Sequence, residues 1–408
     1  MRLTPARIGT FVAICGLTAA VTASSATAAP MHTSVTARAA ATSSINWAQD
    51  GFNKGQTGYN AFETAIGASN VGSLTYRFSI VSPVAKDSCS QQGPPIVDNG
   101  RLFISDQGGF GAYNPTTGAQ LWNVREPGDP QENITPLLVA SGNTVIAVET
   151  DCISQSDPPS EMTAYNATTG APLWSVNSDP AIFSLVIDGN VVVTSGAPAE
   201  GPETAGYNLA TGAQIWANSD DAADVALSAG GTMLLTNFDG SGSTAINVAT
   251  GATKWTTTKV WTEFASSKDG TKIAATSGND VVYLNAVTGA VLWTATGIGA
   301  YCRALVGCAF AAIDATHIYI AAGATLTALN TSNGHVAWHV TVNSFLDRPV
   351  VANGVVYVPQ TGDAMDLFKA STGAQLDGSQ YVGEINHAVV VNGFLYVTNG
   401  RVMDAFTP

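Results

Sequence analysis

The stretch that decides the fold of this chain is Tyr113-Asn114-Pro115-Thr116-Thr117-Gly118-Ala119-Gln120-Leu121-Trp122, because the chain repeats it with variation to its end. Each copy keeps an Asn, three residues, a Gly, three more residues and a Trp. Five further intact copies end at Trp174, Trp216, Trp255, Trp293 and Trp338, and a degraded copy has Asp377 at the Trp position. The glycines of the seven copies are Gly118, Gly170, Gly212, Gly251, Gly289, Gly334 and Gly373. They are 38 to 52 residues apart, a period typical of repeat architectures rather than of a single-core domain.

Each repeat contains four short apolar runs separated by turn residues. In the seventh repeat, residues 349–352 are followed by Asn353-Gly354 and then by residues 355–358. Asn-Gly tolerates the positive φ of tight hairpins, and the later Thr-Gly closes a second hairpin in which the repeat Asn can bond to its own turn. The pattern predicts four antiparallel strands, with the Trp on the outermost strand covering the seam to the next copy. Because one such sheet cannot bury both faces, the copies must stack radially as the blades of a propeller.

The two ends of the chain predict how the ring closes. After Gly373 the chain has three more apolar runs, within residues 387–406, and then ends without a fourth. Upstream, residues 72–80 have the spacing of an outermost strand, with Gly72 in the Gly place and Tyr76 in the Trp place. An N-terminal strand that completes the last blade would remove two sheet edges. The prediction is an all-β, eight-bladed β-propeller of four-stranded antiparallel blades, closed by this strand.

The first part of the chain predicts export. Residues 1–28 resemble a secretory signal peptide, with Arg2 and Arg7, an apolar stretch over residues 8–21, and Ala26-Thr27-Ala28 as the cleavage site. Residues 29–44 are rich in Ala, Thr and Ser and predict a flexible leader. Residues 45–73 are irregular but contain four aromatic residues, so we expect them to lie against the propeller, which makes 45–408 one domain.

The charge of the mature chain limits its partners. Removal of the signal leaves 14 basic and 30 acidic residues, a net charge of −16. This excess argues against nucleic acid and against insertion into an anionic membrane. We expect a soluble, secreted, extracellular monomer.

The motif Ala-Tyr-Asn-x-x-Thr-Gly-x-x-x-Trp resembles the PQQ repeat of the quinoprotein alcohol dehydrogenase-like β-propellers. The resemblance covers nearly all of residues 72–408 and implies that Gly and Trp interlock neighbouring blades. It also implies two kinds of function. Some members are alcohol or sugar dehydrogenases that use pyrroloquinoline quinone (PQQ) and a divalent cation, and others are binding platforms without a cofactor.

The sequence favours the platform. The resemblance implies adjacent cysteines and large extra segments around the cofactor in many of the dehydrogenases, and this chain has neither. His335 and His339 would share one strand face without a third metal ligand, and Asp220, Asp221 and Asp224 are better explained as a solvated acidic turn. We therefore expect no metal and no cofactor, with PQQ and calcium needed only if the protein is a quinone-dependent oxidoreductase with its site in the central funnel. Catalytic residues, if any, are not identified by the sequence.

Ligand contacts are expected on the face that carries the longer loops, where an extracellular protein or a small polar ligand would bind. Two polar residues, Arg348 and His387, follow Asp347 and Asn386 at equivalent points of successive blades and are the preferred donors. An alternative is that these side chains only line a hydrated channel. The candidate ring around the central funnel comprises Gln92, Glu132, Asn133, Glu263, Arg303, Asp347, Arg348, Asn386 and His387.

Four cysteines remain after removal of the signal, and export favours their oxidation. Cys89 and Cys152 fall on the same face of neighbouring blades, and Cys302 and Cys308 share one long loop several blades away. Since a disulfide needs Cα atoms within about 7 Å, the pattern predicts Cys89–Cys152 and Cys302–Cys308. The alternative for the second pair is two reduced thiols.

Overall fold

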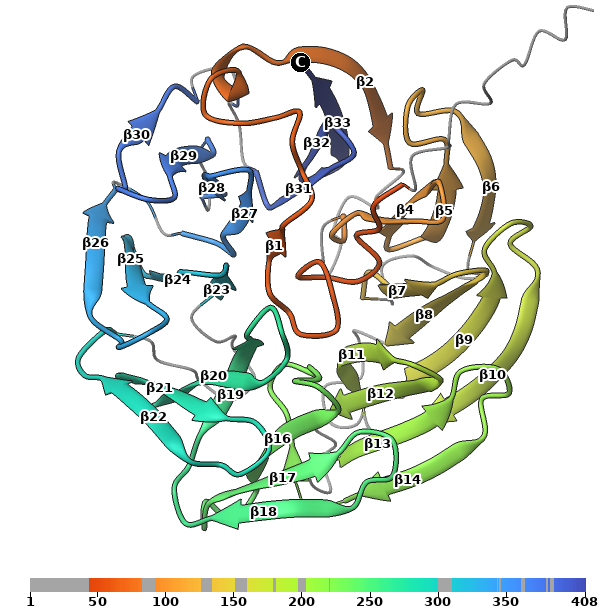
Figure 1. Ribbon diagram of the computed structural model, residues 1–408. Coiled ribbons are helices and arrows are strands. Elements are labelled where there is room, and N and C mark those ends of the chain that lie inside the picture. The colour runs from red at the N-terminus through yellow and green to blue at the C-terminus, as the bar shows by residue number, and fades with distance from the viewer. Residues whose placement is uncertain are drawn as a thin grey trace, which may run out of the picture. The chain divides into compact units, whose positions relative to one another are not determined.

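The computed structural model describes residues 44–82, 92–125, 134–150, 160–178, 181–196, 203–219, 221–299, 310–342, 344, 346–360, 364–378, 381 and 385–408. The predicted signal peptide and all but the last residue of the predicted leader lie outside these ranges. Residues 44–408 form one compact unit. Its strands are arranged in eight sheets placed radially around a centre (Figure 1). The predicted all-β, eight-bladed fold is therefore confirmed.

The first four blades follow one another along the chain. Blade 1 contains β3 (Ile96–Asp98), β4 (Arg101–Asp106), β5 (Gly109–Tyr113) and β6 (Gln120–Arg125), and blade 2 contains β7 (Leu137–Ser141), β8 (Thr144–Thr150), β9 (Ser160–Asn166) and β10 (Pro172–Ser178). Blade 3 contains β11 (Ile182–Asp188), β12 (Val191–Gly196), β13 (Glu203–Asn208) and β14 (Gln214–Asn218). Blade 4 contains β15 (Asp221–Ala222), β16 (Thr232–Asn237), β17 (Ser243–Asn247) and β18 (Thr253–Thr257). In each blade the strands run in order from the centre outward.

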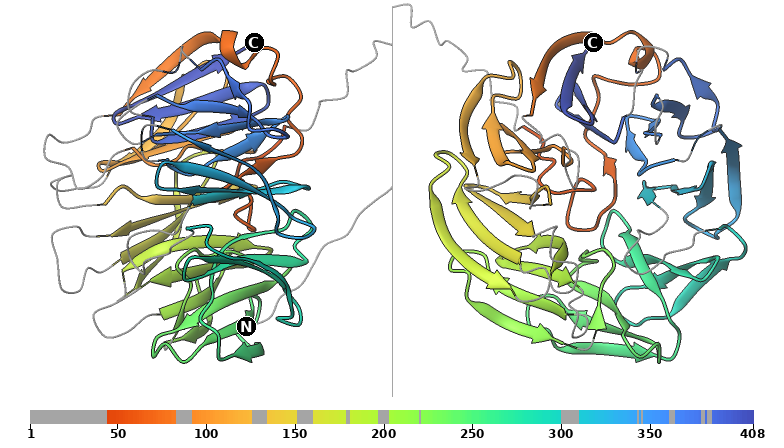
Figure 2. Two further views of the ribbon diagram at one scale, coloured as in Figure 1. Left: turned by 90° about the vertical axis from the view of Figure 1, so that its left-hand side faces the viewer. Right: turned by 180° about the vertical axis from the view of Figure 1, so that it is seen from behind.

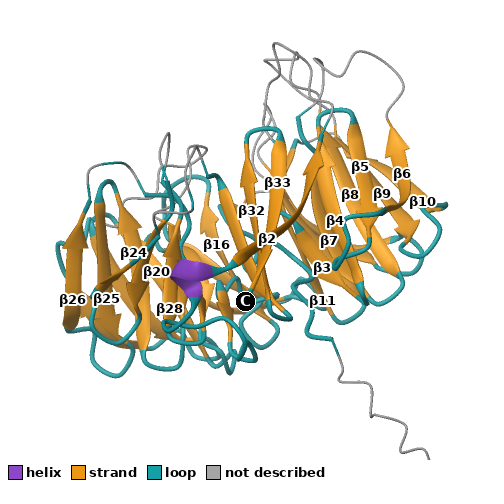
Figure 3. Cartoon of the chain, turned by 90° about the horizontal axis from the view of Figure 1, so that it is seen from above, coloured by secondary structure: helices purple, strands orange, loops and turns teal. Residues whose placement is uncertain are grey.

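The second half of the ring continues the pattern and then closes it. Blade 5 contains β19 (Thr262–Ser266), β20 (Lys272–Ser277), β21 (Asp280–Asn285) and β22 (Val291–Ala295), and blade 6 contains β23 (Phe310–Ile313), β24 (His317–Ala322), β25 (Thr325–Asn330) and β26 (Val336–Thr341). Blade 7 contains β27 (Val350–Ala352), β28 (Val355–Val358), β29 (Asp366–Lys369) and β30 (Gln375–Leu376), with β1 (Tyr59–Asn60) added in parallel to β27. Blade 8 contains β31 (His387–Val391), β32 (Phe394–Asn399), β33 (Val402–Thr407) and, as its outermost strand, the N-terminal β2 (Thr75–Val81). The side view shows the sheets stacked against one another, and the view from above shows how little helix accompanies them (Figures 2 and 3).

Helix is confined, within the described residues, to the short 3-10 turn η1 (Val71–Ser73). No described helix has the length and apolar character needed to cross a membrane.

The hairpin turns have the predicted chemistry. In blade 7 the turn between β27 and β28 has Asn353 at φ 42° and Gly354 at φ 76°, so both central residues are left-handed. In blade 1 the side-chain oxygen of Asn114 accepts hydrogen bonds from the N–H groups of Thr116 and Thr117 at 2.9 and 3.1 Å. Because strands alternate in direction, the turns between first and second and between third and fourth strands share one face of the ring. We call this the turn face, and the opposite face the loop face.

Six seams between blades are built in the same way from the repeat Gly and Trp. Gly170 of blade 2 has φ 73°, and a Cβ placed on it would lie 2.8 Å from the ring of Trp122 in blade 1, so only Gly lets the indole approach. The indole N–H then donates to the carbonyl of the residue after the repeat Asn of the next blade, or after Lys369 at the same place in blade 7, as Trp122 does to Ala167 at 3.1 Å. The other five such bonds, at 2.9–3.1 Å, run from Trp174 to Leu209, Trp216 to Val248, Trp255 to Ala286, Trp293 to Thr331 and Trp338 to Ala370.

The closing blade corrects one sequence prediction. Tyr76 was expected to occupy the Trp place, but its side chain is 53% exposed, and it is Phe78 that faces Gly118 of blade 1. The register of β2 against β33 shifts between Tyr76 and Phe78, and the outermost strands of blades 1–6 shift in the same way just before their Trp. In this register Tyr76 corresponds to Gln120 of blade 1 and Phe78 corresponds to Trp122. The aromatic position therefore lies two residues further from Gly72 than the regular spacing predicts. Spacing from Gly72 alone therefore selected the wrong aromatic residue.

Candidate functional site

The N-terminal segment crosses the centre of the ring, on the turn face (Figure 1). We call residues 45–60 the strap. Its backbone or side chains bond to each blade in ring order, next to the first turn of that blade. The partner lies in the innermost strand except in blade 4, where Ser228 lies between β15 and β16. The contacts, from blade 1 to blade 8, are Trp47 with Val97, Ala48 with Ala140, Gln49 with Ile187, Lys54 with Ser228, Gly55 with Ser266, Thr57 with Ile313, Gly58 with Val351, and Asn60 with Val390.

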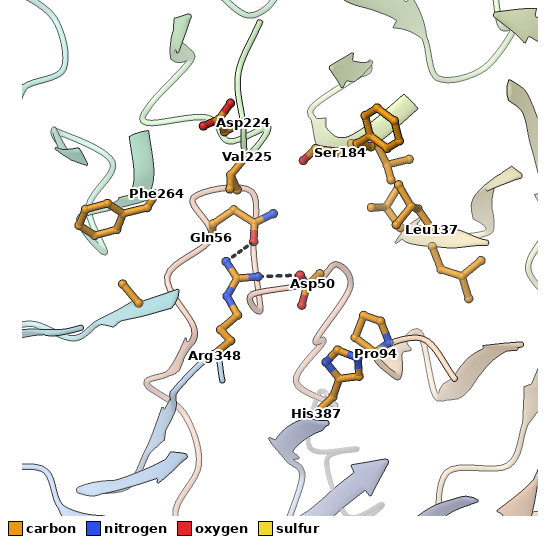
Figure 4. A pocket seen from close by; sticks show the side chains of 15 residues that line it. Asp50, Gln56, Pro94, Leu137, Ser184, Asp224, Val225, Phe264, Arg348 and His387 are labelled. Carbon is orange, nitrogen blue, oxygen red and sulfur yellow. Dashed lines mark hydrogen bonds and ion pairs between the residues drawn. The ribbon is translucent and has the colours of Figure 1, made fainter. Parts of the chain in front are cut away.

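A cavity of about 250 Å³ lies at the centre, with the strap on one side of it (Figure 4). The strap contributes Asp50 and Gln56 to its lining. Most of the wall consists of apolar side chains from residues at the beginning of the innermost strands, and the phenyl ring of Phe183 is 47% exposed. The lining residues are Asp50, Gln56, Pro94, Leu137, Leu138, Val139, Phe183, Ser184, Leu185, Asp224, Val225, Phe264, Ala311, Arg348 and His387.

Two side chains of the strap bind the guanidinium of Arg348. Arg348 Nη1 lies 2.6 Å from Asp50 Oδ2, and Nη2 donates to Gln56 Oε1 at 2.8 Å (Figure 4). Gly51 lies between them with φ 67°, and any Cβ there would collide with the Gln56 side chain. The positive charge of Arg348 is therefore balanced within the protein rather than presented to a ligand.

His387 lies beside this pair and also lines the cavity. Burial lowers the pKa of His387, and the nearby carboxylates of Asp50 and Asp347 oppose that shift. Burial raises the pKa of Asp347, whose Oδ1 accepts the Arg348 backbone N–H at 2.6 Å. We therefore expect a neutral imidazole at His387, next to the guanidinium of Arg348, whose charge is balanced by Asp50.

The other members of the predicted ring are dispersed. Gln92 is buried and joins blade 8 to blade 1, since its N–H donates to Gly400 O at 3.0 Å and its Nε2 to Ser82 Oγ at 2.7 Å. Asn386 donates its backbone N–H to Thr398 O at 2.9 Å and is not part of the cavity lining. Glu132, Asn133 and Arg303 lie outside the described residues, as do Cys89, Cys152, Cys302 and Cys308, so the two disulfides stay predictions.

Glu263, in β19 of blade 5, has a structural role through its side chain, which contacts blade 4. The short strand β15 pairs only with Thr236 and Asn237, and the backbone N–H of Leu234 donates instead to Glu263 Oε2 at 3.0 Å. The side chain is 1% exposed, and burial raises its pKa well above the usual range. Glu263 therefore replaces part of a missing innermost strand.

The described residues do not form a metal centre. No group of three or more His, Cys, Asp or Glu side chains comes together within them. His335 and His339 are both exposed, Asp224 lines the cavity, Asp221 belongs to β15, and Asp220 is not described.

Sequence reasoning missed Asp50 and Gln56. The aromatic residues of the segment indicated contact with the propeller but not its path. The available signal was the cluster of Gly51, Gly55 and Gly58, which is unusual for a segment that packs and which permits close approach to other backbone.

Comparison with known proteins places these features in a family. A family model described as outer membrane protein assembly factor BamB matches residues 32–157, 158–300 and 277–377, which together make up most of the chain. The chain belongs to this family of PQQ-repeat β-propellers. A search of curated proteins finds no sequence match.

Solved structures share the fold of this PQQ-repeat protein. BamB from Moraxella catarrhalis has 16% identity and a TM-score of 0.58, with 82% of this chain and 100% of that chain covered. Quinohemoprotein alcohol dehydrogenase from Comamonas testosteroni has 14% identity and a TM-score of 0.65, with 89% and 80% covered. Sqt1 from Saccharomyces cerevisiae has 12% identity and a TM-score of 0.57, with 80% and 99% covered. At these identities the similarity establishes the fold and leaves the activity open.

The described lining does not fit PQQ. PQQ carries several carboxylates, and the cavity wall contains a single Arg and no Lys among the described residues. That Arg348 already bonds to Asp50 and Gln56 of the strap. The described part of the chain also lacks a group of side chains that could hold the accompanying cation.

Proposed function

We propose that this protein is a secreted, non-catalytic β-propeller that serves as a binding or scaffolding platform for an extracellular protein or ligand on its loop face. The observation that supports this most is the strap, because the protein's own N-terminal segment covers the turn face at the centre and uses the charge of Arg348. The longer connections between strands belong to the loop face, and loops on a rigid scaffold are where such folds carry function.

Exposed apolar side chains on the loop face support the same conclusion. Phe238, in the turn between β16 and β17, is 74% exposed, and Val260, between β18 and β19, is 42% exposed. Exposed aromatic residues are enriched at protein interfaces.

The first test separates platform from enzyme. Purified mature protein is mixed with PQQ and calcium, and dye reduction is followed with alcohols and aldoses. We expect no turnover above a heat-denatured control. Turnover would replace the platform by the quinone-dependent oxidoreductase.

A second test addresses the face. A photo-crosslinking residue is placed at Phe238 or, as the matched control on the turn face of the same blade, at Thr250. Incubation with the extracellular fraction of the producing cells should yield a discrete adduct from position 238 only. An adduct from position 250 alone would contradict the assignment of the face.

A further inference from the structure

Different interactions hold the ends and the middle of the strap. At its beginning, Trp47 and Phe52 are buried and their rings meet edge-on at 5.1 Å, and just beyond its end Ile66 is fully buried. Between them, residues 53–58 are Asn, Lys, Gly, Gln, Thr and Gly, without a single apolar side chain larger than a methyl group. Apolar burial therefore holds the two ends, and polar contacts hold the middle.

The backbone is strained just before this middle region and within it. Phe52 has φ 79° and Gln56 has φ 52°, whereas the other non-glycine residues with positive φ in the described chain are asparagines of Asn-Gly turns. Side chains other than Asn and Asp rarely adopt this conformation, and such strain persists only where the surroundings impose it.

Two side-chain contacts impose it here. Lys54 Nζ lies 2.5 Å from Asp188 Oδ1 in blade 3, and Arg348 of blade 7 holds Asp50 and Gln56. The two ion pairs are exposed to a similar degree, because Arg348 and Asp50 are 17% and 51% exposed and Lys54 and Asp188 are 46% and 15% exposed. Arg348 differs in binding two strap side chains at once, so its release frees both Asp50 and Gln56.

We propose that the strap is a latch that closes the turn-face end of the central cavity, with Arg348 as the residue that keeps it closed. When Arg348 releases Asp50 and Gln56, residues 53–58 open while Phe52 stays buried against Trp47 and the ring stays folded, because β2 still closes the last blade. Opening removes Gln56 from the cavity lining and gives the cavity a second mouth. This inference does not depend on the identity of any platform partner.

Four backbone amides report directly on the latch. The N–H groups of Ser228, Ser266, Ile313 and Val351 donate to strap carbonyls at 2.6–2.8 Å. Amides such as those of β12 and β13 are instead paired within a blade and report on global unfolding.

The experiment is hydrogen exchange by mass spectrometry on the full mature chain and its Arg348→Met variant. Arg125→Met is the matched control, because Arg125 on β6 forms a comparable ion pair with Asp106 on β4 of blade 1, away from the strap. In Arg348→Met the four latch amides should exchange about tenfold faster, as expected for loss of a charged hydrogen-bonded contact, while the blade amides and the control variant stay unchanged.

Two results would overturn the proposal. If the latch amides exchange as slowly as those of β12 and β13 in both proteins, the strap opens only with the whole ring. If Arg348→Met accelerates all amides alike, Arg348 supports the ring rather than the latch. Asp50→Asn provides an independent variant, in which the same four amides should accelerate.

Discussion

Six seams of the ring and the two seams that flank the closing blade solve the same packing problem with different residues. In the regular seams an indole lies on a glycine and donates its N–H to the next blade. Between blades 7 and 8, Gly72 faces Asp377, and between blades 8 and 1, Gly118 faces Phe78, neither of which has an indole N–H. Tyrosines provide hydrogen bonds there: Tyr381 Oη donates to Val71 O at 2.6 Å, and Tyr396 Oη donates to Pro115 O at 2.8 Å.

The difference shows that all seams pair an interlocking side chain with a hydrogen-bond donor, but that the residues supplying them do not follow the same sequence motif. Where the chain begins and ends, the interlocking aromatic ring and the hydrogen-bond donor come from separate residues. Blade 8 is also the only blade whose strands join the two ends of the described chain. We therefore expect the ring to be weakest on either side of blade 8.

The largest effect is expected from removing the closing strand. Deletion of residues 72–80 removes most of β2 and exposes β33 and the side of blade 1, two edges open to pairing with other molecules. The protein should aggregate, as measured by light scattering and size-exclusion chromatography. A deletion variant as soluble and heat-stable as the parent would contradict closure by this strand.

The next effect compares the two kinds of seam directly. Trp216→Ala removes a ring that is 9% exposed together with its bond to Val248, and should lower the free energy of unfolding by about 3–5 kcal/mol. Phe78→Ala in the closing seam removes a smaller, only partly buried ring and should cost roughly 1–2 kcal/mol less. Urea unfolding of both variants measures the difference. Equal losses would show that the closing seam is as strong as the regular ones.

A pH effect is expected in blade 1, where Asp98 contacts blade 2 and the strap. Burial raises the pKa of Asp98 in blade 1 to about 6, against hydrogen bonds from Gly142 and Asn46 and the charge of Arg101. Since the folded state binds the proton more tightly than the unfolded state, this group stabilises the fold below the unfolded pKa near 4, and that stability is lost as the pH rises to about 6. Asp98→Asn should remove up to about 2–3 kcal/mol of this pH dependence of unfolding. An unchanged pH profile between pH 4 and 6.5 would rule out this titration.

The smallest effect tests whether a tyrosine replaces the indole. Tyr396→Phe leaves Pro115 O without its donor from blade 8 and should cost about 1 kcal/mol. Tyr76→Phe is the control, because Tyr76 is on the same blade but is largely exposed. Thermal unfolding that is the same for both variants would remove Tyr396 from the seam.

A separate pair of variants tests whether Arg348 and His387 donate hydrogen bonds to a ligand, as the sequence predicted. Arg348→Ala and His387→Ala both alter the cavity lining, so either should change the affinity of any ligand bound at the centre. A ligand screen by calorimetry in which both leave every detected affinity unchanged would reduce these residues to channel lining and latch.

Much of the architecture could be predicted from the sequence. The Asn-x-x-x-Gly-x-x-x-Trp repeat determined the blades, their number and the closing strand, because turn chemistry is local and each blade packs only on its neighbours. The role of Arg348 could not be predicted. Its sequence neighbours resemble those of His387, yet its partners Asp50 and Gln56 lie about three hundred residues away.

The tertiary structure alone decided the path of the strap and the place of Phe78. The strap contacts every blade through backbone groups and unlike side chains, so no repeated pattern in the sequence records these contacts. The pairing of β2 with β33 places Phe78 in the seam and Tyr76 in solvent, because register depends on the strand that β2 pairs with. Packing that repeats between neighbouring blades can thus be predicted from this sequence. Single contacts between residues far apart in the chain are determined only by the folded ring.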